Sequence, residues 1–294
     1  MAEKEFKTID EQISLLRSRG LIIENEEDAR RFLLYNNYYR VSGYSLTLRK
    51  HDVFNQHATM QNIMDIYHFD HAFRHLLLKY LDKIETRFKS VYAYHFAAMH
   101  GPTGYLDASL FTDQDIYHDT MNKAETQKFT RLPHEAYLKH FVEERMEPIP
   151  LWAYVDLFTI GNVSMLYAIT DPAVKKQIAW DFGLTMKKGA VLLGEFMHSM
   201  TILRNLCAHG SRLYNRLFNQ KPSLRTDDKR CLRHIADGTP DNAHLYGYIF
   251  VMKRLLAPEE STELLRELIA LTEQYSFVRM KYYGFRDDWK SALA

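Results

Sequence analysis

The chain has 294 residues, enough to bury a sizeable core as one large domain or two modest ones. Hydrophobic residues make up 46% and charged residues 26%, a balance typical of globular proteins, and the net charge of +1 neither favours nor excludes a nucleic-acid partner. Two cysteines are too few for a disulfide scaffold or a four-thiolate zinc site. No apolar run is long enough to cross a bilayer, and the start, MAEKEFKTIDEQ, lacks the apolar core of a signal peptide, so we expect a cytoplasmic protein with no membrane contact.

The first 50 residues predict a helical segment that packs on the rest of the chain. Thr8 and Glu11 have the spacing of a capping box, and Asn25 is placed to cap a second helix. Residues 38–44, YYRVSGY, are unusually aromatic and contain a glycine. They fit either a loop packed on the main body or a platform on which RNA bases stack.

Residues 60–99 carry the strongest helical pattern, because apolar residues recur there at spacings of three and four. These residues are Phe69, Phe73, Leu76, Leu77, Tyr80, Leu81, Ile84 and Phe88. His71 and His75 lie one turn apart, a spacing that can bind a metal. No HExxH pattern or carboxylate at ligand spacing accompanies them, so we expect solvated or core-edge histidines and no metal site. Residues 105–147 are polar and predict one or two helices at the rim.

The second half of the chain also predicts helices. Residues 152–169 are apolar enough for one largely buried helix, in which Asp156 would need a buried arginine as partner. Asp171-Pro172 has the form of a helix start, and further helices are expected near 243–256 and 259–276. No alternating run demands a strand. The sequence therefore predicts an all-α fold.

Residues 203–216, LRNLCAHGSRLYNR, combine basic and apolar positions. An arginine and a nearby histidine supply a fixed positive charge and a group that transfers protons near neutral pH. If residues 191–217 form one ideal helix, a polar stripe lies opposite its apolar face. The stripe consists of His198, Asn205, His209, Arg212 and Arg216. It fits either a functional surface or a solvated helix face.

The ideal helix separates two residues of this stretch. Arg204 lies about 140° from His209 around the helix, so joint action is easier if the helix is distorted. Gly210 is the expected place, because glycine is costly inside a helix and favoured at its end. Cys207 falls on the apolar face and is expected to be a buried residue, not a nucleophile.

The stretch from Arg204 to His209, followed by residues 212–216, resembles the signature of the Abi family, proteins of abortive infection against bacteriophage, within the HEPN superfamily of helical ribonucleases. Other stretches resemble further parts of the family, in the same order: residues 37–44, Phe69-Asp70 with Arg74, Ile84-Glu85 with Arg87, residues 150–162 and residues 284–289. The resemblance implies a HEPN-like helical domain over residues 51–294, with residues 1–50 as an additional N-terminal helical segment.

The resemblance also implies an activity: a toxin-like, metal-independent endoribonuclease of antiviral defence, without a cofactor and with a composite site at a homodimer interface. Arg204 would clamp the phosphate, Asn205 would orient the phosphate or the histidine, and His209 would act as general acid or base. The remaining expected RNA contacts are Arg212, Asn215, Arg216, Tyr39 and Arg40.

The alternative is a non-catalytic RNA-binding protein on the same scaffold, with a small regulatory RNA or an antitoxin as its partner. The chain departs from the family at one relevant position. Relatives often carry a second histidine directly after the motif histidine, and Gly210 stands there in this chain. If that second histidine assists catalysis elsewhere, activity here would be weaker.

Overall fold

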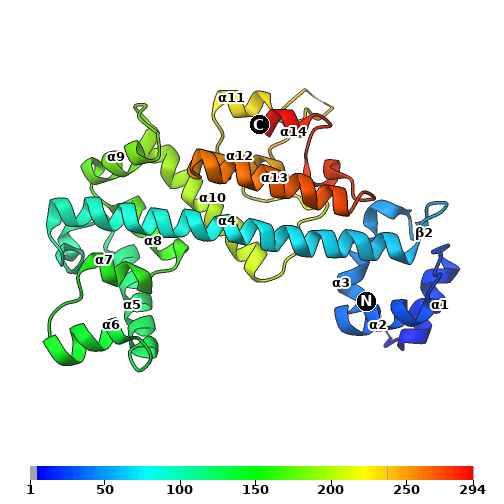
Figure 1. Ribbon diagram of the computed structural model, residues 1–294, viewed down its shortest axis with the longest axis horizontal. Helices are drawn as coiled ribbons and strands as arrows, with labels where there is room; N and C mark the ends of the chain where they lie inside the picture. The colour runs from blue at the N-terminus through cyan, green and yellow to red at the C-terminus, as the bar shows by residue number, and fades with distance from the viewer. Residues whose placement is uncertain (1–4, 237, 294) are drawn as a thin grey trace.

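Helix α4 (Met60–His100) runs the length of the molecule in the computed structural model, which describes residues 5–236 and 238–293 (Figure 1). It begins at a capping box, in which the Thr59 hydroxyl accepts from the Asn62 N–H and the Asn62 side chain accepts from the Thr59 N–H. It ends at Gly101, whose φ of +80° suits glycine. The helix predicted over residues 60–99 is confirmed.

Helices from the second half of the chain pack along α4, as Figure 1 shows. They are α8 (Ile160–Ile169), α9 (Pro172–Asp181), α10 (Gly189–Ala208), α12 (Leu245–Leu255) and α13 (Pro258–Gln274). Asp171 caps α9 by accepting a hydrogen bond from the Ala173 N–H, and Pro172 fills the first helical position. The helices predicted to begin at Asp171-Pro172 and to lie near 243–256 and 259–276 are therefore confirmed.

The N-terminal segment lies at one end of α4 and consists of short helices: α1 (Ile9–Ser18), α2 (Glu26–Asn36) and α3 (Tyr38–Ser42). The predicted capping box of Thr8 and Glu11 and the predicted cap at Asn25 both form. Residues 38–42 form a helix rather than the loop that was one of the two interpretations of this stretch, because the Asn37 side chain accepts from the Tyr39 N–H and starts a new turn.

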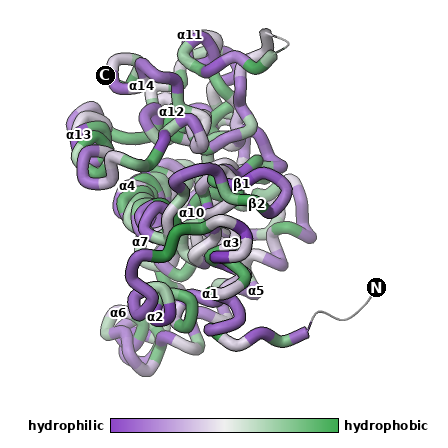
Figure 2. The backbone as a smooth tube through the Cα atoms, turned by 90° about the vertical axis from the view of Figure 1, so that its right-hand side faces the viewer, coloured by the Kyte–Doolittle hydropathy of each residue, from purple (hydrophilic) through white to green (hydrophobic). Residues whose placement is uncertain are grey.

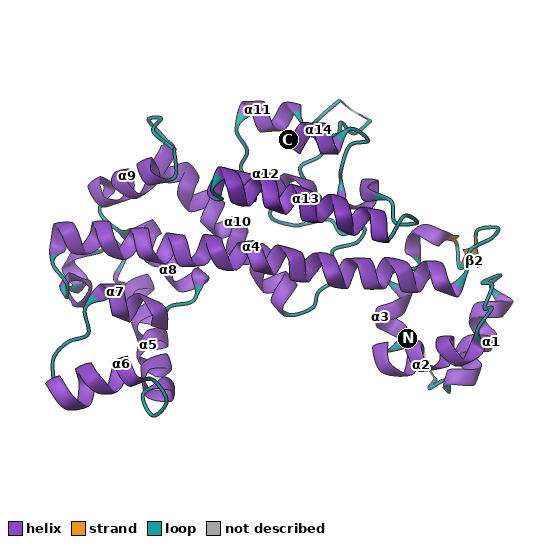
Figure 3. Ribbon diagram, in the orientation of Figure 1, coloured by secondary structure: helices purple, strands orange, loops and turns teal. Residues whose placement is uncertain are grey.

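A two-stranded antiparallel sheet follows, with β1 (Arg49–Lys50) and β2 (Val53–Phe54) joined by a turn. The turn is hydrophilic in Figure 2, and the strands are coloured orange in Figure 3. Because helices make up nearly all the regular structure of residues 5–236 and 238–293, the predicted all-α fold is confirmed.

The expectation of one helix over residues 152–169 is wrong. The chain instead forms α7 (Leu151–Tyr154), a 3₁₀ turn over Val155–Leu157, and then α8. The break has a local cause: Thr159 and Asn162 form a capping box that starts α8. Asp156 is consequently exposed rather than buried, and its backbone carbonyl accepts from the Arg131 guanidinium at 2.9 Å.

The remaining elements lie around this framework. The predicted rim helices of residues 105–147 are α5 (Gln114–Arg131) and α6 (Ala136–Lys139), the latter continued by a π-helical turn over His140–Arg145. Two short helices, α11 (Thr226–Arg230) and α14 (Trp289–Leu293), lie near the C-terminus. Further 3₁₀ turns cover Leu46–Leu48, Gly104–Leu106, Ala108–Leu110 and Met280–Tyr283.

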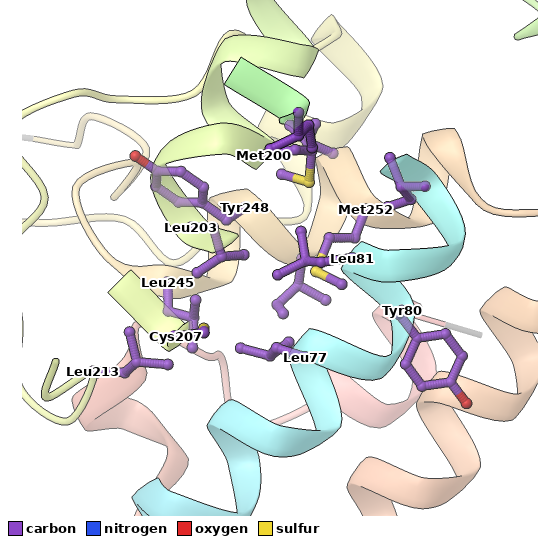
Figure 4. Packing of buried hydrophobic residues seen from close by; sticks show 14 of the residues in the cluster. Leu77, Tyr80, Leu81, Met200, Leu203, Cys207, Leu213, Leu245, Tyr248 and Met252 are labelled. Atoms are coloured by element: carbon purple, nitrogen blue, oxygen red, sulfur yellow. The ribbon is translucent and has the colours of Figure 1, made fainter. Parts of the chain in front are cut away.

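The core at the middle of α4 is built from three helices that cross there. Figure 4 shows Leu77 and Leu81 of α4 facing Leu203 and Cys207 of α10, with Leu245, Tyr248 and Met252 of α12 beside them. All of these side chains are buried. The apolar face of α10 thus fixes which of its other residues face solvent.

Candidate functional site

Helix α10 ends at Ala208, so the predicted helix over residues 191–217 is wrong beyond that point. The Gly210 N–H donates to the Cys207 carbonyl at 3.0 Å, and the Ser211 N–H donates to the Leu206 carbonyl at 2.9 Å. With Gly210 at a φ of +64°, these bonds form a Schellman motif. The expected distortion at Gly210 is confirmed, and it takes the form of a helix end.

The loop after this helix end is held by one buried carboxylate, Asp70 of α4. Asp70 accepts a hydrogen bond from the Tyr214 N–H at 2.8 Å and longer ones from the Leu213 N–H at 3.2 and 3.3 Å. Further donors surround the same carboxylate: the Arg74 guanidinium and the hydroxyl groups of Tyr44 at 2.8 Å and Tyr283 at 3.0 Å. Residues from three distant parts of the chain thus meet at Asp70.

Burial raises the pKa of the Asp70 carboxyl, and the Arg74 guanidinium and the hydrogen-bond donors oppose that rise. Arg74 is itself buried beside the carboxylate, and its Nη1 also lies 3.4 Å from the Tyr44 hydroxyl. A buried carboxylate needs such donors, because an unpaired charge in the core is costly. The buried aspartate with an arginine partner that the sequence predicted at Asp156 is found at Asp70 instead.

Sequence reasoning assigned no role to Asp70, although a signal was present. Asp70 and Arg74 stand one turn apart within the most apolar helical pattern of the chain. Opposite charges at this spacing on a buried face predict an internal ion pair. What the spacing does not reveal is the loop that the pair holds.

The three expected catalytic residues all lie on the last turns of α10 or at its end. Asn205 and His209 are exposed, and His209 is the C-cap residue, whose N–H donates to the Asn205 carbonyl at 3.0 Å. Arg204 Nη1 lies 3.4 Å from the Asn205 side-chain oxygen. Its side chain is 36% exposed, and its Nε lies 3.9 Å from the Glu85 carboxylate of α4, at the outer limit of an ion pair. Arg204 is therefore not locked into a buried pair.

Glu85 borders a hollow of about 310 Å³ on the surface of α4. The hollow is also lined by the carboxylates Asp82 and Asp156 and by the indole of Trp152, which is 60% exposed. Lys89 also lines the hollow and pairs with Glu85 at 2.8 Å, so Arg204 stands beside a hollow in which carboxylates outnumber cations.

The expected RNA contacts Arg212, Asn215 and Arg216 do not continue a helical stripe from His209, because the helix has ended before them. Arg212 turns back on its own loop, where Nη1 donates to the Tyr214 carbonyl at 2.6 Å. Arg216 Nη1 lies 3.4 Å from the Arg212 carbonyl, and its guanidinium lies 5.8 Å from the Phe218 ring centre. Asn215 is exposed, with a φ of +48°.

Tyr39 and Arg40 are separated from the motif by some 165 residues of chain, and Arg40 contacts the residue that follows the motif. The Arg40 Nη2 donates to the Gly210 carbonyl at 2.6 Å, directly after His209. Tyr39 is 85% exposed, whereas Tyr44 of the same aromatic stretch is fully buried against Asp70. The stretch therefore divides into an exposed half and a buried half.

A cleft of about 550 Å³ lies between this N-terminal segment, α4 and the end of α10. Arg40, His71, His75, Ala208 and Gly210 are among the residues that line it. Within residues 5–236 and 238–293, no group of three or more histidine, cysteine or acidic side chains is arranged to hold a metal ion. The motif thus borders a cleft whose charged side chains are basic.

Comparisons with known proteins match the chain to one family. A search of the curated proteins and a search of the solved structures each found no match. None of the helices in the described ranges combines the length and apolar character needed to span a bilayer. The family model described as Abi-like protein matches residues 31–215, from within α2 to the loop that follows α10. The chain therefore belongs to the Abi-like protein family, and this membership suggests a role in phage defence by abortive infection.

Proposed function

We propose that this protein is a metal-independent endoribonuclease of the HEPN type that acts in phage defence. One observation carries the proposal. At the end of α10, the polar groups Arg204, Asn205 and His209 reach solvent, while Leu203 and Cys207 beside them are buried. The fold thus presents a guanidinium, an amide and an imidazole on one short stretch.

The proposed reaction is attack of a ribose 2′-OH on the adjacent phosphorus. A bond forms between the 2′ oxygen and phosphorus while the bond to the 5′ oxygen breaks, leaving a 2′,3′-cyclic phosphate and a 5′-hydroxyl. The general base takes the 2′-OH proton, and the general acid gives a proton to the leaving 5′ oxygen. His209 has a side chain suited to either step, because one ring nitrogen of an imidazole can accept a proton and the other can donate one. Arg204 would stabilise the charge that grows on the phosphate oxygens, and Asn205 would orient the phosphate or the imidazole.

A homodimer with a composite site fits these requirements. The reaction uses both an acid and a base, and the motif of each chain contains a single histidine, His209. Arg204 reaches toward Glu85 of its own α4, whereas an ideal helix would place His209 about 140° further around. Two copies that face each other would bring two Arg204–His209 pairs to one phosphate. Light scattering on the purified full chain tests this, with a dimer expected.

The activity itself is tested by incubating the purified protein with single-stranded RNA and with DNA of the same sequence. Wild type is expected to cut RNA in the presence of EDTA and to leave DNA intact, because DNA lacks the 2′-OH. His209→Ala and Arg204→Ala should lose cleavage while keeping the wild-type melting curve and dimer mass. Persistent cleavage by both variants would contradict the assignment.

A second candidate is a non-catalytic RNA-binding protein, with a small regulatory RNA or an antitoxin as partner. The 85% exposed Tyr39 beside Arg40 favours it, because an exposed aromatic ring next to a guanidinium can bind bases without any catalytic group. Tight RNA binding that is unchanged in His209→Ala, with no cleavage products from wild type, would support this candidate.

A further inference from the structure

A pair of histidines faces the cleft beside the motif and has no part in the reaction described above. His71 and His75 lie on successive turns of α4, with their Nε2 atoms 3.3 Å apart and their ring centres 4.5 Å apart. Both rings are exposed and line the cleft together with Ala208 and Gly210, the two neighbours of His209. The pair is therefore open to a ligand that also reaches the motif.

The charges around this pair favour an anion. Arg40 and Arg74 also line the cleft, and the described residues that line it include no aspartate or glutamate. Asp70, the carboxylate next to His71 on α4, is buried and accepts hydrogen bonds from Arg74 and from the Tyr214 N–H. It therefore does not face the cleft. Arg40 donates one N–H to the Gly210 carbonyl, and a guanidinium has five in total.

We propose that His71, His75 and Arg40 form a phosphate-binding subsite, which holds an RNA phosphodiester next to the one cleaved at His209. This inference rests on the proposed function, because it assigns the ligand as the RNA substrate. The two Nε2 atoms lie 3.3 Å apart, so both imidazoles can direct an N–H toward the same bound oxygen. The Arg40 guanidinium, which lines the same cleft, adds planar, paired N–H groups that can donate to phosphate oxygens.

The affinity of such a subsite depends on pH. His68, His75, Arg40 and Arg74 face His71 from α3 and α4, and burial and these cationic neighbours lower the pKa of His71. From the third element, the end of α10, the cleft is lined by Ala208 and Gly210, the chain neighbours of His209. A bound phosphate favours the charged imidazole, so RNA should bind more tightly as pH falls through the range where histidine takes up its proton.

A metal ion is the competing ligand, because histidines four residues apart on a helix are a known metal-binding spacing. Zinc sites normally use three or four protein ligands, and no third histidine, cysteine or carboxylate joins this pair among the described residues. A divalent cation would also lie beside the Arg40 guanidinium, which repels it. The surroundings therefore favour phosphate over a metal.

The test is RNA binding by the full chain, measured by fluorescence anisotropy with a 2′-O-methyl oligonucleotide that cannot be cleaved. Wild-type affinity is expected to rise about tenfold between about pH 8 and pH 6. The double variant His71→Gln/His75→Gln should lose this rise, and inorganic phosphate should compete with RNA in wild type only. The matched control is His118→Gln, an exposed histidine of α5, which should keep the rise.

A second variant guards against a mere loss of folding. His71→Lys carries a charge at both pH values, so its affinity at about pH 8 should approach that of wild type at about pH 6. A pH dependence that survives in the double variant would overturn the proposal. So would binding that EDTA abolishes and Zn²⁺ restores, in favour of a metal site. RNA cleavage is measured separately, with wild type compared against His209→Ala. If wild type cleaves RNA but its binding does not depend on pH, the subsite is contradicted and the ribonuclease is not. If binding depends on pH but wild type does not cleave RNA, the ribonuclease is contradicted.

Discussion

The Asp70 carboxylate accepts a 2.8 Å hydrogen bond from the Tyr214 backbone N–H, across 144 positions of sequence. This bond joins the first third of α4 to the loop that follows the Arg204–His209 motif. Tyr44 and Tyr283 donate to the same carboxylate from the two ends of the chain. Asp70 is thus the point at which the fold holds the candidate site in place.

Asp70→Ala should destabilise the protein by about 3–5 kcal/mol, because it leaves the buried Arg74 guanidinium and two backbone N–H groups without their acceptor. Urea unfolding measures the loss. The control is Asp82→Ala, which removes an exposed carboxylate from the same helix and should cost less than about 0.5 kcal/mol. Equal unfolding curves for the two variants would contradict the role given to Asp70.

Gly210→Ala should destabilise the protein by about 1 kcal/mol, because a φ of +64° strains a residue with a side chain. The new Cβ would also lie 3.2 Å from Arg40 Nη2 and press on its bond to the Gly210 carbonyl. Gly194→Ala is the comparison, since Gly194 lies within α10 and a Cβ there makes an ordinary 3.5 Å contact with Tyr167. Gly194→Ala should be neutral or stabilising by up to about 1 kcal/mol. If thermal unfolding shows Gly194→Ala to be less stable than Gly210→Ala, the Schellman motif at the end of α10 is contradicted.

Arg40→Ala should weaken RNA binding by about tenfold at low salt, because it removes a phosphate donor beside His209. Its effect on stability should stay below about 1 kcal/mol, since the Arg40 side chain is exposed. Arg31→Ala, an exposed arginine of α2 that pairs with Asp28, provides the control and should bind RNA like wild type. Equal losses in both variants would mean that the contribution of Arg40 is only general charge.

Cys207 should resist thiol reagents in the folded protein at about pH 8, whereas Cys231 should react. Cys207 is only 4% exposed, and burial raises the pKa of its thiol to about 12, so almost no thiolate is present. Mass spectrometry after labelling identifies the modified residue, and urea should make both cysteines reactive. Rapid labelling of Cys207 without denaturant would contradict its burial in the core.

Local sequence signals predicted much of this fold. The spacing of Phe69, Phe73 and Leu77 in α4 and the caps at Thr8, Asn25 and Asp171 act over a few residues, so they can be read without tertiary information. The error over residues 152–169 arose at Thr159–Asn162, where a capping box overrides an otherwise continuous apolar pattern.

The candidate site was harder to predict, because its geometry depends on long-range contacts. Gly210 was the expected point of distortion, yet the helical wheel still extended through Arg212 and Arg216, which lie in a loop. The contacts of Asp70 with Tyr214 and of Arg40 with Gly210 span 144 and 170 positions. No pattern in either partner's own neighbourhood specifies such a contact.

Mapping the ends of RNA products tests the central claim most directly. Purified wild type and His209→Ala are incubated with the same single-stranded RNA in EDTA, and the new 3′ and 5′ ends are identified by mass spectrometry. We predict 2′,3′-cyclic phosphate and 5′-hydroxyl ends from wild type and no new ends from His209→Ala. Products with 5′-phosphate ends, or the same cyclic ends from both proteins, would contradict a ribonuclease that acts through His209.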